Sequence, residues 1–215
     1  MDDCSRKNLV SCLVDQGYIK SPSVKKAFLA VSREKFVPID QKSYAYLDKP
    51  LQIGNNQTIS APHMVAIMCE SLDIKPGHKI LEVGSGSGYH AAIVSKLVGD
   101  SGHIYSVERI EKLAKKAQDN LKSENISNVT IVIGDGSEGL STYQPYDRIY
   151  VTCAAPQVPQ MLIDQLANHG KLLIPVGDMY CELQLIQKIG QKIKIKNLGG
   201  CVFVPLIGRY GQHEK

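Results

Sequence analysis

A glycine-rich stretch carries the clearest chemical signature in the sequence. Gly84, Gly86 and Gly88 alternate with serines directly after a short apolar run, and Glu82 lies two residues before the first glycine. Glycines at such a strand-to-helix junction let the backbone turn sharply and let a ligand approach the main chain closely. The G-x-G-x-G spacing differs from the G-x-G-x-x-G of dinucleotide-binding loops, and the preceding carboxylate favours a ligand with an amine over a pyrophosphate.

Two acidic residues further along the chain extend this candidate site. Glu108 ends the next apolar run, where a carboxylate can accept hydrogen bonds from both hydroxyls of a ribose. Asp135, followed by Gly136 at the end of the third run, could accept a hydrogen bond from an adenine amino group. Together the three features predict one crevice of adenosyl size. The alternative for each of them alone is an ordinary turn glycine or helix cap.

The elements that must position these residues follow a regular series. Apolar residues at helical spacing, such as Leu113, Ala117 and Leu121, separate short apolar runs that are typical of strands. Such a β-α-β-α series predicts a parallel sheet covered by helices, with ligands at the carboxyl ends of the strands. The predicted strands are residues 79–83, 104–107, 129–133, 148–152 and 171–176.

The two ends of the chain depart from this series. Gly190-Gln191 between residues 183–189 and 192–195 predicts an antiparallel hairpin. Before the glycine loop, residues 9–14 show helical spacing, Ser21-Pro22 predicts the start of a second helix, and Pro62 that of a third.

The stretch between the second and third of these helices lacks periodicity. Residues 44–56 accumulate proline, glycine and asparagine, so we expect a loop there. The whole pattern predicts an α/β fold of Rossmann-like type: a doubly wound, mostly parallel sheet of seven strands with a C-terminal antiparallel hairpin and an N-terminal helical extension. We expect one domain, in which residues 1–75 supply helices and an active-site loop and residues 76–215 form the cofactor-binding core.

These residues resemble those of class I methyltransferases that use S-adenosylmethionine, and more narrowly those of the protein-L-isoaspartate O-methyltransferase family. The most family-specific block is Gln-Thr-Ile-Ser-Ala-Pro-His-Met at residues 57–64, upstream of the glycine loop. Eukaryotic members of this family usually have histidine and threonine where this chain has Val65 and Ile207, and at both positions the chain resembles prokaryotic members. The other matching blocks, which extend the resemblance over almost the whole chain, are residues 33–38, 81–89, 107–109, 134–136, 145–149, 172–177 and 203–206.

The resemblance implies methyl transfer from S-adenosyl-L-methionine to the free α-carboxyl of L-isoaspartyl residues in damaged proteins and peptides, which is a repair reaction. It also implies that Ser60 is the active-site hydroxyl, beside the transferred methyl and the substrate carboxylate. His63, in the first turn beyond Pro62, is a further candidate for substrate contact. The residues that we expect to bind the cofactor are Thr58, Ile59, Ser60, Glu82, Gly84, Ser85, Gly86, Gly88, Glu108, Asp135 and Gly136.

The implied chemistry is compatible with these residue types. A peptide α-carboxyl has a pKa of about 3.5, so the nucleophile is ionised near neutral pH and needs no general base. The displacement needs alignment and exclusion of water, and Ser60 could donate one hydrogen bond that orients the carboxylate. The alternatives are that Ser60 caps a helix and that His63 is a surface or packing residue. Cys153 falls at the fourth strand end beside the crevice, and we expect it to pack there and not to act as a nucleophile.

Composition limits the remaining function classes. The chain has 215 residues, of which 43% are hydrophobic and 21% charged, and its net charge of +4 is too small and dispersed to predict nucleic-acid binding. Its six cysteines form no C-x-x-C pair, so we expect no metal site, no disulfide framework and a reducing cytoplasm. No signal peptide or apolar run of about 18 residues is present, so we expect a soluble protein without a membrane partner. Nothing requires an oligomer, so a monomer is expected.

Three rival functions remain to be separated. A related methyltransferase could act on another small-molecule or protein acceptor, although the Asp/Asn-Pro-Pro-aromatic motif of DNA amino-methyltransferases is replaced by Thr-Cys-Ala-Ala-Pro at residues 152–156. A nicotinamide-dependent oxidoreductase is disfavoured by the glycine spacing and by Glu82. A non-catalytic binding module is disfavoured because Ser60, Glu82, Glu108 and Asp135 are all present.

Overall fold

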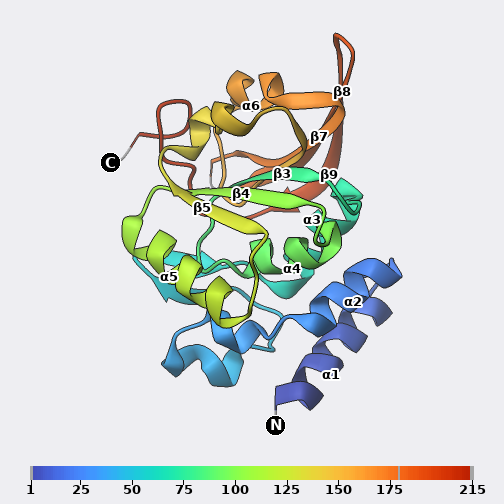
Figure 1. The fold of residues 1–215 in the computed structure, drawn as a ribbon, viewed down its shortest axis with the longest axis vertical. Coiled ribbons are helices and arrows are strands. Elements are labelled where there is room, and N and C mark those ends of the chain that lie inside the picture. Colours follow the sequence, from blue (N-terminus) through green and yellow to red (C-terminus); the bar gives the residue numbers. More distant parts are fainter. Residues whose placement is uncertain (1, 179, 214–215) are drawn as a thin grey trace.

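The computed structural model describes residues 2–178 and 180–213. A seven-stranded sheet with the order β5-β4-β3-β6-β7-β8-β9 forms its centre (Figure 1). Neighbouring strands from β5 to β7 pair in parallel, whereas β8 is antiparallel to both β7 and β9. This confirms the predicted fold class. The strands are β3 Lys79–Val83, β4 His103–Glu108, β5 Val129–Ile133, β6 Tyr146–Val151, β7 Leu166–Gly177, β8 Cys181–Ile189 and β9 Lys192–Cys201.

Helices cover both faces of the sheet because alternate strand residues point to opposite sides. In β3, the fully buried Ile80 packs in the core cluster that contains helices α3, α4 and α5, whereas Leu81 packs in a second cluster with Leu162 of α6. Figure 1 shows α4 and α5 on one side of the sheet and α6 on the other. No helix in the described residues has the length and apolar character of a membrane span. These helices are α3 Pro62–Leu72, α4 Tyr89–Val98, α5 Glu111–Ser123 and α6 Gln160–Asp164.

The N-terminal helices form an additional layer outside α3 and α4 (Figure 1). Helix α1 spans Asp2–Asp15 and α2 spans Pro22–Ala30. As predicted, Ser21 caps α2, and its side chain accepts a hydrogen bond from the Val24 N–H. The Glu70 carboxylate of α3 accepts hydrogen bonds from the backbone N–H and hydroxyl of Ser21 at 2.8 and 2.9 Å. These contacts fix the helical extension to the core.

The segment expected to be a loop contains secondary structure. A two-stranded antiparallel hairpin, β1 Leu51–Gly54 and β2 Gln57–Ile59, occupies the end of residues 44–56 and the start of the next block. Its turn places Asn55 and Asn56 at positive φ, a conformation that asparagine tolerates better than most residues and that suits a two-residue hairpin. The expectation of a loop was wrong. The two strands have only four and three residues, which is too few to show a clear alternation in the sequence. In the structure, Leu51 and Ile53 are buried and the residues that alternate with them are exposed, as is typical of a strand.

After β9 the chain turns back and crosses the carboxyl ends of the parallel strands. The Ala154 N–H donates to the Val204 carbonyl at 2.7 Å, and the Leu206 N–H donates to the Ala154 carbonyl at 2.8 Å. Residues 202–207 therefore lie beside the strand ends where the sequence predicts a ligand.

Candidate functional site

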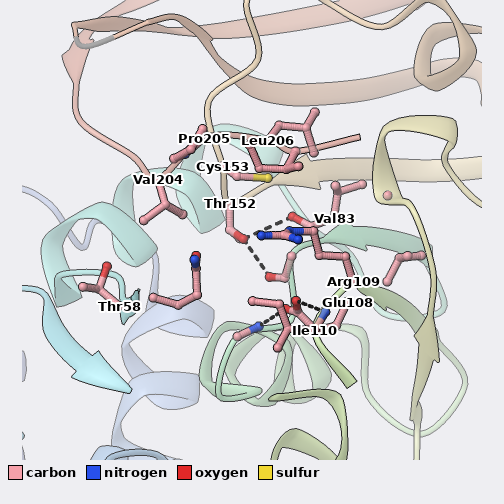
Figure 2. A pocket seen from close by; sticks show the side chains of 16 residues that line it. Thr58, Val83, Glu108, Arg109, Ile110, Thr152, Cys153, Val204, Pro205 and Leu206 are labelled. Carbon is pink, nitrogen blue, oxygen red and sulfur yellow. Dashed lines mark hydrogen bonds between the residues drawn. The ribbon is translucent and has the colours of Figure 1, made fainter. Parts of the chain in front are cut away.

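The glycine loop joins β3 to α4 and packs against the end of β6. Thr152 donates hydrogen bonds to the carbonyls of Gly84 at 2.7 Å and of Val83 at 3.1 Å (Figure 2). Gly84 has a φ of +93°, and a Cβ atom at this position would overlap with the Thr152 hydroxyl. Glycine is therefore required at residue 84 by both conformation and space.

Glu108, at the end of β4, is held against the same loop. Its Oε2 accepts a hydrogen bond from the Gly86 N–H at 2.9 Å, and its Oε1 accepts one from the Ile110 N–H at 3.0 Å. The side chain is buried among these groups. Each carboxylate oxygen has two acceptor sites, so both can still accept a hydrogen bond from a ligand hydroxyl.

A hollow opens between the strand ends and the chain that follows β9, and we call it the strand-end hollow. Figure 2 shows Thr152 and Cys153 on one side, Glu108 and Ile110 opposite, and Val204 on a third wall. A Cβ atom on Gly136 would come within 2.5 Å of Val83 Cγ1, so the chain after β5 can lie this close to β3 only because residue 136 is glycine. The lining residues are Gln57, Thr58, Val83, Gly84, Gly86, Val107, Glu108, Arg109, Ile110, Gly136, Thr152, Cys153 and residues 204–207.

Two further hollows adjoin the first. The loop hollow is lined by residues 58–60, Val65, residues 84–87, Tyr89, His90 and Thr152. The outer hollow is lined by Pro50, Thr58, residues 60–61, His63, Met64, Thr152 and residues 200–204. Thr58 and Thr152 line all three hollows, and Ser60 lines the loop hollow and the outer hollow. A group bound in one hollow is therefore next to a group bound in another.

Ser60 lies between β2 and α3, and it is half-buried. Ala61, not Ser60, is the N-cap residue of α3, and the cap makes no side-chain hydrogen bond. Within residues 2–178 and 180–213, the Ser60 hydroxyl has no hydrogen-bond partner in the chain. The alternative that Ser60 is a helix cap is therefore wrong, and its hydroxyl remains available to a ligand.

His63, in the first turn of α3, lines the outer hollow and has a fixed orientation. Its Nδ1 lies 2.9 Å from Oδ1 of Asp48, and its backbone N–H donates to the same oxygen at 2.9 Å. The ring also packs on Tyr18, with the ring centroids 5.3 Å apart.

Glu82 lies behind the glycine loop and lines none of the three hollows that the described residues form. Its side chain is fully buried, and its Oε2 accepts a hydrogen bond from the Ser106 hydroxyl. The Ser106 hydroxyl is 2.5 Å from that of Ser85 in the loop. Burial raises the pKa of Glu82 to about 8, so the carboxyl is mostly protonated at neutral pH. Glu82 is thus connected to the glycine loop by hydrogen bonds through the hydroxyls of Ser106 and Ser85.

Asp135 and Gly88 also lie outside the lining of these hollows. Both carboxylate oxygens of Asp135 accept hydrogen bonds from the chain, Oδ1 from the N–H and hydroxyl of Ser137 and Oδ2 from the Arg209 N–H. Gly88 has a φ of +85° and is the N-cap residue of α4. Asp135 fixes the segment after β9, and Gly88 fixes the end of the loop.

Three contributors to the site were not assigned a role from the sequence. Thr152 follows β6, so the rule that ligands bind at the carboxyl ends of parallel strands could have identified it. Asp48 and residues 204–207 reach the site through contacts between distant parts of the chain. No local pattern marks Asp48, whereas residues 203–206 matched the family without indicating a role. Cys153 is buried, and burial raises the pKa of its thiol, which agrees with the packing role expected from the sequence.

Comparisons with known proteins agree along nearly the whole chain. A family model described as protein-L-isoaspartate(D-aspartate) O-methyltransferase (PCMT) matches residues 4–211. A protein-L-isoaspartate O-methyltransferase of Methanothermobacter thermautotrophicus is 50% identical over 209 residues, covering 96% of this chain and 96% of the relative. One from Methanopyrus kandleri is 52% identical over 213 residues, covering 98% of this chain and 94% of the relative.

Solved structures show the same similarity in three dimensions. A protein-L-isoaspartate O-methyltransferase structure superimposes with a TM-score of 0.88 at 31% identity, over 96% of this chain and 67% of that one. A putative protein-L-isoaspartate O-methyltransferase from Plasmodium falciparum, solved with S-adenosyl-L-homocysteine, gives a TM-score of 0.84 at 29% identity, over 94% of this chain and 98% of that one. Because these matches cover 96% and 94% of this chain, the similarity extends beyond the sheet.

Proposed function

Because the chain belongs to the protein-L-isoaspartate(D-aspartate) O-methyltransferase family, it is a repair methyltransferase, and we propose that Ser60 is the hydroxyl that aligns its substrate. The reaction transfers a methyl group from S-adenosyl-L-methionine to the α-carboxyl of L-isoaspartyl residues in damaged proteins and peptides. One observation carries the proposal for Ser60. It lines both the loop hollow and the outer hollow, so it lies where a donor bound in the first would meet an acceptor bound in the second.

The strand-end hollow has the features that an adenosyl group requires. S-adenosyl-L-methionine supplies an electrophilic methyl group on its sulfonium when it is bound. We assign the ribose hydroxyls to Glu108, whose two oxygens are fixed by backbone N–H donors, and the closest backbone approach to Gly84 and Gly86. Gly136, Thr58, Ile59, Ser60 and Ser85 complete the proposed contacts, because they line this hollow or the loop hollow.

Two of the three remaining candidates, Glu82 and Gly88, are proposed to act from behind the surface of the hollow. Glu82 supports the glycine loop through Ser106 and Ser85, and Gly88 sets the start of α4. Asp135 holds the segment after β9, and its remaining acceptor capacity suits an adenine amino group.

Acceptor chemistry needs few groups from the chain. The substrate carboxylate is already ionised, so Ser60 needs only to donate one hydrogen bond that holds an oxygen in line with the methyl group. We assign the residues flanking the isoaspartate to the outer hollow, where His63 would contact substrate.

Transfer of labelled methyl to synthetic peptides tests this function. We expect labelling of a peptide with one L-isoaspartyl residue and no labelling of the matching L-aspartyl peptide. Equal labelling of both peptides, or of neither, would contradict the proposal and favour another acceptor for the same fold.

The organisation and the cellular location of the enzyme are also proposed. We propose a single domain, because residues 1–75 and 76–215 share one hydrophobic core cluster. A cytoplasmic location is supported by free cysteines at residues 12, 69, 153, 181 and 201, four of which are buried. A monomeric state and the absence of nucleic-acid and membrane partners remain predictions from the sequence.

A further inference from the structure

We propose that Asp48 is a positioning residue for substrate binding: its carboxylate orients His63 so that the imidazole can contact the peptide beside the isoaspartate in the outer hollow. This inference rests on the proposed function, because it assigns the outer hollow to the acceptor. It concerns a residue that lies before β1 and that makes no contact with the strand-end hollow in the described part of the chain.

The contact between the two residues is specific. A single oxygen, Oδ1 of Asp48, accepts from the backbone N–H of His63 and lies 2.9 Å from its Nδ1. Both side chains are about one-third exposed, so the pair lies at the edge of the outer hollow and not inside the core. A ring held at its Nδ1 by a carboxylate and packed on Tyr18 has little freedom to rotate.

The chain beside Asp48 contacts a buried cation. The Arg33 guanidinium is fully buried, and its Cζ lies 4.9 Å from the centroid of the Tyr89 ring. Its Nη2 donates a hydrogen bond to the Lys49 carbonyl at 3.4 Å. Arg33 thus helps to fix the backbone directly after Asp48.

The chemistry of such a pair suits a peptide acceptor. A histidine that donates its Nδ1–H to a carboxylate leaves Nε2 free to accept a hydrogen bond from a ligand. A backbone N–H of the peptide beside the isoaspartate can donate that bond. The Asp48 carboxylate thus selects both the ring orientation and the tautomer in which Nε2 is an acceptor.

This role predicts an effect on acceptor binding and not on the chemical step. In Asp48→Ala we expect KM for the isoaspartyl peptide to rise about tenfold, kcat to change less than about threefold, and the Kd for S-adenosyl-L-methionine to stay constant. In Asp48→Asn, which keeps an acceptor oxygen for the backbone N–H, we expect KM to rise at least about threefold because the charge is lost. Asp40→Ala, an exposed aspartate in the preceding turn, serves as the matched control and should leave KM unchanged.

A double-mutant cycle separates positioning from a general effect on the fold. If Asp48 acts through His63, the Asp48→Ala/His63→Ala enzyme should have the same peptide KM as His63→Ala alone. Additive increases in KM, or an unchanged KM in Asp48→Asn, would overturn the proposal. Failure of the wild-type enzyme to label the isoaspartyl peptide would instead contradict the proposed function, so the two failures are distinguishable.

Discussion

The carboxylate of Glu108 accepts a hydrogen bond from the Gly86 N–H at 2.9 Å. This contact ties the end of β4 to the glycine loop, which connects β3 to α4. The residue proposed to bind ribose therefore also sets the position of the loop that would approach the cofactor. One side chain couples recognition of the nucleoside to the shape of the hollow.

Glu108→Gln tests this double role. A glutamine amide has one acceptor oxygen, so it cannot serve both the Gly86 and the Ile110 N–H groups. The substitution also removes one oxygen proposed to accept from the ribose, and a hydrogen bond to a charged group contributes about 1.5–3 kcal/mol, which corresponds to an increase of about tenfold to a hundredfold in the Kd for S-adenosyl-L-methionine. Isothermal titration calorimetry measures this change. Glu111→Gln, at an exposed glutamate nearby, is the control, and equal affinities of the two variants would show that Glu108 is not needed.

Ser60→Ala should separate turnover from cofactor binding. A hydrogen bond to a charged group contributes about 1.5–3 kcal/mol, so kcat for the isoaspartyl peptide should fall about tenfold to a hundredfold. The Kd for S-adenosyl-L-methionine should change much less. The free energy of unfolding should also stay near the wild-type value, because Ala61 is the N-cap residue of α3. Wild-type turnover in this variant would remove Ser60 from the active site.

The buried Glu82 should make the free energy of unfolding depend on pH. Burial raises the pKa of this carboxyl from 4.5 to about 8, so the folded protein holds its proton where the unfolded chain has released it. Stability from this group is therefore fully present below pH 4.5 and is lost as the pH rises toward and through about 8. Glu82→Gln is neutral at every pH and should lose less stability across that window. Urea unfolding at several pH values measures the difference.

The matched variant for this experiment is Glu182→Gln, which changes an exposed glutamate of β8. It should reproduce the pH dependence of the wild-type protein. Parallel stability curves for the wild type, Glu82→Gln and Glu182→Gln would mean that Glu82 is not protonated in the folded state.

Gly136→Ala tests how closely β3 and the loop after β5 must approach. The new methyl group would lie 2.5 Å from Val83 Cγ1, and overpacking of this kind costs about 1–3 kcal/mol. We expect a lower unfolding free energy and weaker cofactor binding. Val83→Ala removes the clashing atom, so the double variant should be less destabilised than the sum of the two single variants. A fully additive result in denaturant unfolding would argue against the clash.

Much of the fold could be predicted because its signals are local. The apolar run at residues 129–133 coincides with β5, and Gly190-Gln191 lies at the turn between β8 and β9. The hairpin of β1 and β2 was missed because three or four residues are too few to establish a period-2 pattern. Helix α2 was recognisable from Ser21-Pro22, since capping is a property of adjacent residues.

The candidate site was less predictable, because side-chain direction and tertiary contacts decide it. Gly84, Gly86 and Glu108 line the strand-end hollow as the sequence suggested, since they follow strand ends directly. Glu82 lies within β3, so its side chain points into the packed interior and not toward the hollow. Asp48 approaches His63 only because the chain between them forms the β1–β2 hairpin. The spacing of Asp48 and His63 in the sequence does not show that the chain folds back in this way.

The wall formed by residues 204–207 has a consequence for the synthesis of the enzyme. The glycine loop and Glu108 are synthesised before residues 204–207, which follow β9 in the chain and line the strand-end hollow. A chain that ends before residue 204 therefore contains the residues proposed to recognise the methyl donor but lacks one wall of the hollow that would hold it.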